Sequence, residues 1–157
     1  PSALNLPRVL FAAGALSALA GELEALGVHR PLLVTDQGLV AVGLAARAVA
    51  ACGRAAAPAI FDSVTENPLF ADVDRGAACY AQQGCDGVVA LGGGSVIDTA
   101  KMIALLATNP GACAHYAGVR NAAHGPTAPL IVIPTTAGTG SEASPSAGIH
   151  PDGRRHG

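Results

Sequence analysis

The sequence is poor in aromatic and charged residues. Its 157 residues include no tryptophan, two tyrosines and three phenylalanines, and only 13% are charged, with a net charge of −2. Domains that bind nucleic acid usually carry a basic surface, so this composition argues against a nucleic-acid partner. Half of the residues are apolar. We therefore expect a core built mainly of alanine and aliphatic side chains, in one domain.

Long hydrophobic runs are also missing. An apolar run such as 128–133 is far shorter than the ~18–20 residues that a membrane-spanning helix needs. No basic segment followed by an apolar stretch, as in a secretory signal, precedes the first expected element. From these absences we expect no membrane partner and a cytoplasmic location.

Cysteine and histidine are present without metal-binding spacing. The four cysteines, Cys52, Cys79, Cys85 and Cys113, include no C-x-x-C pair. The five histidines form no H-E-x-x-H pair. We expect free, buried thiols and no metal site within these residues.

Apolar runs of strand length alternate with segments of helical periodicity, which is typical of βαβ units in a mostly parallel sheet. Strands are predicted at 8–11, 31–35, 59–61, 86–91 and 130–133. Helices are predicted at 16–26, 39–52, 67–84 and 96–108, and an irregular segment at 111–128.

The most informative segment is the run 92–95 (GGGS), between a predicted strand and a predicted helix. Glycines allow a sharp turn and have no Cβ to keep a ligand away. The first N–H groups of the helix and the positive end of its dipole then face the loop, which predicts an anion site, most often for phosphate. A well-capped helix is the alternative, since Ser95 and Asp98 have the spacing of a capping box. Lys101, one turn further on, could reach a phosphate or lie in solvent.

Two other strand ends carry polar residues. Asp36 follows the second strand, where a carboxylate can accept both hydroxyls of an adenosine ribose and disfavour NADP, or can simply cap the next helix. The segment 135–142 (TTAGTGSE) could wrap the far half of a dinucleotide, or form an ordinary turn. Its match to G-x-G-x-x-A lacks the following helix of a Rossmann fingerprint. The run 93–97 also lacks the closing glycine of a nucleophile elbow, which argues against an esterase.

Together these motifs resemble the iron-containing (group III) alcohol dehydrogenase family. The resemblance rests on the run 92–95 with Asp98 and Lys101, and on the run 133–142 (IPTTAGTGSE). The glycine motif alone is shared with glycerol dehydrogenase and dehydroquinate synthase. The resemblance implies a Rossmann-like, mostly parallel sheet flanked by helices, as in the dehydroquinate synthase-like N-terminal domain, which in the family precedes a helical domain. One departure is 11–14 (FAAG), which keeps only the second glycine of the family's G-x-G.

The resemblance also implies a set of NAD-binding residues. Asp36 would hold the adenosine ribose, and Asn67 would lie beside the cofactor. The pyrophosphate would rest on Gly93, Gly94 and Ser95, with Asp98 nearer the nicotinamide half. The site would be completed by Thr135, Thr136 and Thr139.

By this resemblance, residues 1–157 form the cofactor-binding domain of an NAD-dependent, metal-assisted alcohol dehydrogenase that acts on a small alcohol or aldehyde. Family members bind a divalent metal, iron or zinc, through one Asp and three His later in the chain. We therefore expect a truncated chain, without catalytic or metal-binding residues of its own, that binds cofactor but is inactive alone. A sibling polyol dehydrogenase and a non-catalytic nucleotide-binding fragment remain alternatives. The sequence does not decide the oligomeric state and is compatible with a homo-oligomer.

Overall fold

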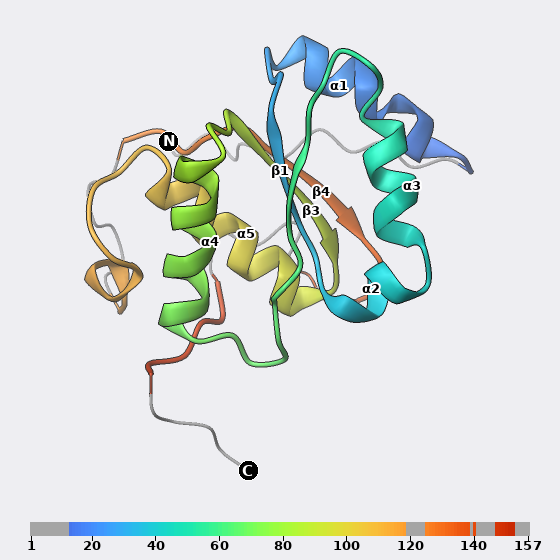
Figure 1. Ribbon diagram of the computed structural model, residues 1–157. Helices are drawn as coiled ribbons and strands as arrows, with labels where there is room; N and C mark the ends of the chain where they lie inside the picture. Colours follow the sequence, from blue (N-terminus) through green and yellow to red (C-terminus); the bar gives the residue numbers. More distant parts are fainter. Residues whose placement is uncertain (1–12, 119–124, 139, 141–146, 153–157) are drawn as a thin grey trace, which may run out of the picture.

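The computed structural model describes residues 13–118, 125–138, 140 and 147–152 (Figure 1). Within these residues four strands form one sheet in the order β2-β1-β3-β4, and every neighbouring pair is parallel. The strands are β1 (Pro31–Val34), β2 (Ala59–Phe61), β3 (Gly87–Gly92) and β4 (Leu130–Pro134). The sheet confirms the expected α/β class with parallel pairing. The strand predicted at 8–11 lies outside the described residues.

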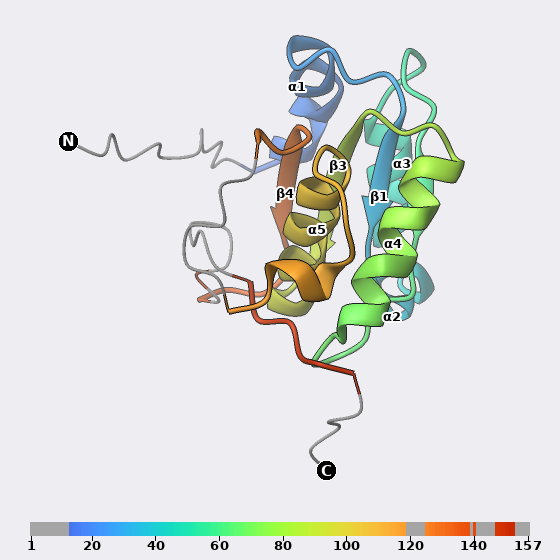
Figure 2. The same ribbon diagram turned by 90° about the vertical axis from the view of Figure 1, so that its left-hand side faces the viewer.

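Helices cover both faces of the sheet (Figures 1 and 2). Their bounds are η1 Ala15–Ala18, α1 Leu19–Ala25, α2 Gln37–Ala41, α3 Leu44–Ala51, α4 Phe70–Gln82, α5 Gly94–Leu106 and η2 Cys113–Tyr116. One hydrophobic cluster joins α1 and α3 to side chains such as Leu33 and Val89. The opposite cluster joins α4 and α5 to their strand neighbours Leu32 and Val88. Alternate strand residues thus fill two cores, as the period of two along a strand requires.

Two helix predictions were wrong in detail. The segment 39–52 is not one helix but two, because Gly43 takes a left-handed conformation (φ 83°) between α2 and α3. The helix expected from Asn67 begins only at Phe70, since Asn67 is itself left-handed (φ 52°) and belongs to the turn before the helix.

The capping box that the spacing of Ser95 and Asp98 left open as an alternative is not formed. The N-cap of α5 is Gly93, and Ser95 already lies inside the first helical turn. The Asp98 carboxylate instead accepts a hydrogen bond from the backbone N–H of Gly148, at 2.8 Å. The helix starts earlier than expected because glycine lets it begin directly at the strand end.

The strand order places a topological switch point beside β1. The chain runs from β1 to β2 on one side and then to β3 on the other. In open parallel sheets, ligands bind in the crevice that such a reversal leaves at the carboxyl ends of the strands. Here those ends lead into Asp36 after β1 and into the glycine run after β3.

Candidate functional site

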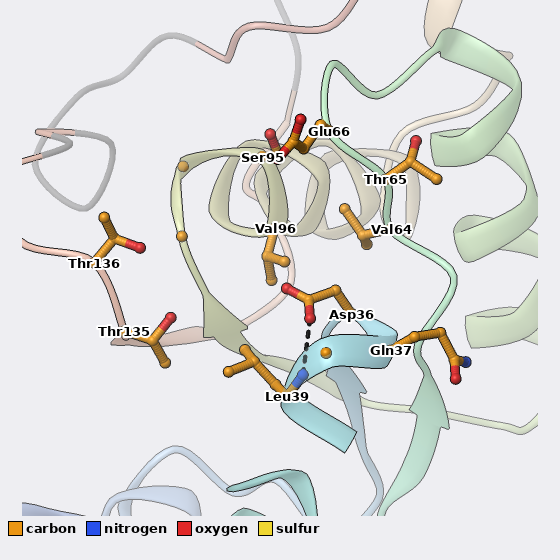
Figure 3. Close-up of a pocket in the computed structure, with 13 residues that line it drawn as sticks. Asp36, Gln37, Leu39, Val64, Thr65, Glu66, Ser95, Val96, Thr135 and Thr136 are labelled. Atoms are coloured by element: carbon orange, nitrogen blue, oxygen red, sulfur yellow. Dashed lines mark hydrogen bonds between the residues drawn. The ribbon is translucent and has the colours of Figure 1, made fainter. Parts of the chain in front are cut away.

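A pocket of about 510 Å³ lies at the carboxyl ends of the strands (Figure 3). Its walls come from the start of α2, the loop after β2, the β3–α5 turn and the end of β4. The lining residues are Asp36, Gln37, Gly38, Leu39, Val64, Thr65, Glu66, Gly93, Gly94, Ser95, Val96, Thr135 and Thr136. This is the place and the size range expected of a small-molecule or cofactor site.

The glycines of the β3–α5 turn are required by close packing. Gly93 has an extended backbone (φ −87°, ψ −165°), so no left-handed conformation is needed there. A Cβ on Gly92 would lie 2.6 Å from the Cβ of Val96, and a Cβ on Gly93 would lie 2.9 Å from Oγ1 of Thr136. The missing side chains let α5 start against the strand end and let the threonine loop approach it.

The N-terminus of α5 faces the pocket through Gly94, Ser95 and Val96. Among the described residues, no side chain caps this thirteen-residue helix at its N-cap. The first N–H groups of a helix have no partner within the helix, and its dipole is positive at this end. The turn therefore offers donors and partial positive charge to an anion in the pocket.

Asp36 contributes to the helix and to the pocket at once. Its Oδ1 accepts a hydrogen bond from the backbone N–H of Leu39 at 2.9 Å, which caps α2 (Figure 3). The carboxylate is half-buried and also lines the pocket. The capping alternative is thus confirmed, and it leaves carboxylate surface available to a ligand.

A buried residue aligns the two strand ends beneath the pocket. The side chain of Thr35 is fully buried, and its Oγ1 donates a hydrogen bond to the carbonyl of Leu91 at 2.9 Å. On the far side of β3, the N–H of Thr135 donates to the carbonyl of Gly92 at 3.0 Å. These bonds fix the positions of the loops that carry Asp36, the glycines and the threonines.

Six of the nine predicted site residues line this pocket: Asp36, Gly93, Gly94, Ser95, Thr135 and Thr136. Figure 3 shows Asp36 and the two threonines on opposite sides of the β3–α5 turn. Thr139 lies outside the described residues.

The other two predicted residues, Asn67 and Asp98, are not among the lining residues. Asn67 is exposed and follows the lining residue Glu66. Asp98 faces Gly148 and forms an ion pair with Lys101, whose Nζ lies 3.8 Å from Oδ1. Lys101 is only 16% exposed, so it does not extend into solvent.

Sequence reasoning assigned no site role to the lining residues from the loop after β2, namely Val64, Thr65 and Glu66. A usable signal was present. They follow a predicted strand, and the carboxyl ends of parallel strands share one edge of a sheet.

The cysteines show no sign of a reactive centre. All four are free thiols; Cys52 and Cys113 are buried, and Cys79 and Cys85 are half-buried. Burial raises the pKa of Cys113 to about 12, and Asp74 adds to the effect. Burial, together with the neighbouring Cys79, raises the pKa of Cys85 to about 11. Thiols with raised pKa values carry little thiolate at neutral pH and are poor nucleophiles.

Two further findings concern the described part of the chain. No group of three or more His, Cys, Asp or Glu side chains there is arranged to hold a metal ion. Nor is any helix in those ranges long and apolar enough to span a bilayer.

Comparisons with known proteins agree with this geometry. The family model described as iron-containing alcohol dehydrogenase matches residues 7–156. The 4-hydroxybutyrate dehydrogenase of Cupriavidus necator is 49% identical over 148 residues, which cover 92% of this chain and 38% of the relative.

Two solved structures match the fold. Sulfoacetaldehyde reductase from Bifidobacterium kashiwanohense, solved in complex with NAD+, matches with a TM-score of 0.77 and 34% identity, over 83% of this chain and 35% of that protein. An alcohol dehydrogenase from an archaeal halo-thermophile of a Red Sea brine pool matches with a TM-score of 0.83 and 31% identity, over 94% of this chain and 40% of the other. The chain thus spans 35–40% of the length of these relatives.

Proposed function

Because the chain belongs to the iron-containing alcohol dehydrogenase family, whose members are oxidoreductases, we propose that its pocket binds NAD. Residues 1–157 would be the NAD-binding α/β domain of an alcohol dehydrogenase. NAD held there would supply hydride transfer between a small alcohol and the corresponding aldehyde. The observation that carries the proposal is the meeting of Asp36, the glycine turn and two threonines at the switch point.

The chemistry of the pocket fits a dinucleotide. The turn at Gly93–Gly94 and the N-terminus of α5 suit the pyrophosphate, since the glycines leave room and the first N–H groups donate. Asp36 suits the adenosine ribose, and a charge-assisted hydrogen bond of this kind contributes about 1.5–3 kcal/mol. The relative solved with NAD+ supports the same cofactor here.

A metal does not fit the described residues, which bring together no set of ligands for one. The family resemblance implies a metal that family members hold through one Asp and three His in a later region of their own chains. We propose that hydride transfer requires that metal, so the 157 residues bind NAD without turning over substrate. A polyol rather than a simple alcohol remains the alternative substrate, and a purely nucleotide-binding role is the alternative function.

Titration with NADH, followed by its fluorescence, tests the proposal. We expect saturable binding that inorganic pyrophosphate competes away, because both ligands would occupy the glycine turn. No binding, or binding that pyrophosphate does not affect, would contradict the assigned site.

A second measurement separates binding from catalysis. Zinc or ferrous iron and a primary alcohol are added to the NAD-loaded chain, and NADH formation is followed by absorbance. We expect no turnover. Sustained turnover would show that the chain holds a catalytic metal by itself.

A further inference from the structure

A short segment, Gly148–Asp152, crosses the starts of α4 and α5. It is the red segment beside the lower end of α4 in Figures 1 and 2. We call it the strap. The side chain of Ile149 packs against the core cluster that α4 and α5 share. The strap is thus attached to the domain by packing as well as by hydrogen bonds.

The strap is bonded to the start of α4 at three points. The N–H of His150 donates to the carbonyl of Pro68 at 2.9 Å, and the N–H of Phe70 donates to the carbonyl of His150 at 3.0 Å. The carboxylate of Asp152 accepts from the N–H of Ala71, the second residue of α4, at 3.0 Å. Since α4 follows directly on residues 64–69, these bonds hold the pocket wall that contains Glu66.

The strap is bonded to α5 through one side chain. Oδ2 of Asp98 accepts from the N–H of Gly148 at 2.8 Å. The Asp98 side chain is 15% exposed, and Lys101 lies 3.8 Å from its Oδ1. That oxygen is buried and has no hydrogen-bond donor among the described residues. Removing a carboxylate from water is costly unless it is paired, so the bond to Gly148 and the lysine charge hold Asp98 in place.

Each of the two anchored helices adjoins one wall of the pocket, α5 through its own first residues and α4 through the loop that precedes it. Residues 64–66 precede α4, and residues 93–96 begin α5. A strap bonded to both helices therefore fixes the separation between these walls. Asp98 is the residue through which α5 is joined to it.

We propose that Asp98 is a positioning residue, which acts on the pocket through the strap and not by touching the cofactor. The proposal rests on the proposed NAD site. Two observations favour it over a direct contact: Asp98 is absent from the lining residues, and its Oδ2 is bonded to Gly148. Gly148 fits this contact closely, since a Cβ there would lie 3.3 Å from Oδ2 of Asp98.

Four variants test the proposal: D98A, D98N, D152A and the double variant D98A/D152A. E24A, at an exposed position on α1, is the control. The ligands are NADH and ADP-ribose, which lacks the nicotinamide. We expect D98A to lower the affinity for both ligands about tenfold, and D152A to lower both affinities about fivefold. The double variant should bind both ligands only slightly more weakly than D98A, because both changes release the same strap and their effects are then not additive.

The conservative variant adds a rescue. Asparagine keeps an oxygen that can accept from Gly148, so D98N should bind both ligands within about twofold of the unmodified chain. E24A should leave both affinities unchanged. A different outcome would overturn the proposal: D98A lowers the affinity for NADH but not for ADP-ribose, and D152A changes neither affinity. That result would place Asp98 against the nicotinamide.

Hydrogen exchange tests the strap without a ligand. D98A and D152A should speed amide exchange in residues 64–71 and 93–98, while E24A should not. Unchanged exchange in both segments overturns the proposal even if NADH binds. If the unmodified chain binds neither NADH nor ADP-ribose, the proposed NAD site is refuted. The hydrogen-exchange result still tests whether the strap holds the two pocket walls.

Discussion

At the scale of single residues, Asp36 has two roles, since it stabilises a helix and also lines the candidate site. One carboxylate oxygen caps α2 through the N–H of Leu39, and the same side chain lines the pocket. A substitution here therefore changes helix stability and ligand preference together, unless the replacement keeps an oxygen at the cap.

Asp36→Ser separates the two effects. Serine is about as good an N-cap as aspartate, so we expect the free energy of unfolding to stay within about 0.5 kcal/mol. It has no charge to repel a 2′-phosphate, so the affinity ratio of NADPH to NADH should rise at least about tenfold. Fluorescence titrations with both cofactors, beside urea denaturation, measure the two quantities.

Asp36→Gly is the companion variant. It should show the same change in cofactor ratio with a loss of a few tenths of a kcal/mol in stability. An unchanged cofactor ratio in both variants would remove Asp36 from the proposed ribose site.

At the scale of elements, the junction of β3 with α5 sets how closely the threonine loop approaches the glycine turn. Gly93 lies against Thr136, and Gly92 lies against Val96. Both contacts are too close for a Cβ, so the junction tolerates no larger residue without movement.

Gly93→Ala should destabilise the chain by about 1–3 kcal/mol, the usual range for an overpacked contact. It should also lower the affinity for NADH, because Thr136 must move away from the glycine turn. Adding Thr136→Ala removes the oxygen that the new Cβ meets and should recover part of the lost stability. Urea denaturation of the single and double variants measures this coupling.

Gly21→Ala is the matched control, since a Cβ there meets nothing within 4 Å and the residue lies in α1. It should be neutral or raise stability by up to about 1 kcal/mol through helix propensity. Equal losses at Gly21 and Gly93 would refute the packing argument.

The elements also show what a sequence can and cannot reveal. The strands were predictable because buried parallel strands are short apolar runs, and β2 was found at its observed bounds. The glycine turn was predictable because a run of glycines between a predicted strand and a predicted helix permits a sharp turn and a close approach. The break at Gly43 was missed, since the apolar periodicity continues across it.

The strap could not have been predicted in this way. Asp98 and Gly148 are 50 positions apart, and Ala71 and Asp152 are 81 apart. No local pattern encodes such pairs. The alternative of a capping box for Ser95 and Asp98 rested on their spacing alone, and in the structure Asp98 is bonded to Gly148 instead.

At the scale of the whole molecule, the sheet separates two cores, and each contains a buried thiol. Cys113 belongs to the cluster under α4 and α5, and Cys52 belongs to the cluster under α1 and α3. Burial raises the pKa of both thiols above their ordinary value. The folded chain therefore holds these protons more tightly than the unfolded chain does.

This predicts a loss of stability at alkaline pH. Below the unfolded pKa of about 9 both states are protonated, and the contribution is fully present. As pH rises toward the folded value of about 12 for Cys113, only the unfolded state loses its proton, so stability falls. Near pH 10.5 the loss from this one group is at most about 2 kcal/mol.

Urea denaturation at neutral and alkaline pH measures this loss. Cys113→Ala should be less stable at neutral pH, because it removes a buried side chain, but its stability should fall less steeply with pH. An equally steep fall in the variant would contradict the assignment to Cys113.

The buried hydroxyl of Thr35 has a consequence for how this site can diversify. By bonding to Leu91 it keeps two neighbouring strands in register up to their last residues. The distance between Asp36 after β1 and the glycine turn after β3 is then set by the spacing of neighbouring parallel strands, about 4.8 Å in any such sheet. The loops can change in sequence without changing the distance between these two strand ends. The side chains that contact a nucleotide can therefore be exchanged while the spacing of the site stays the same.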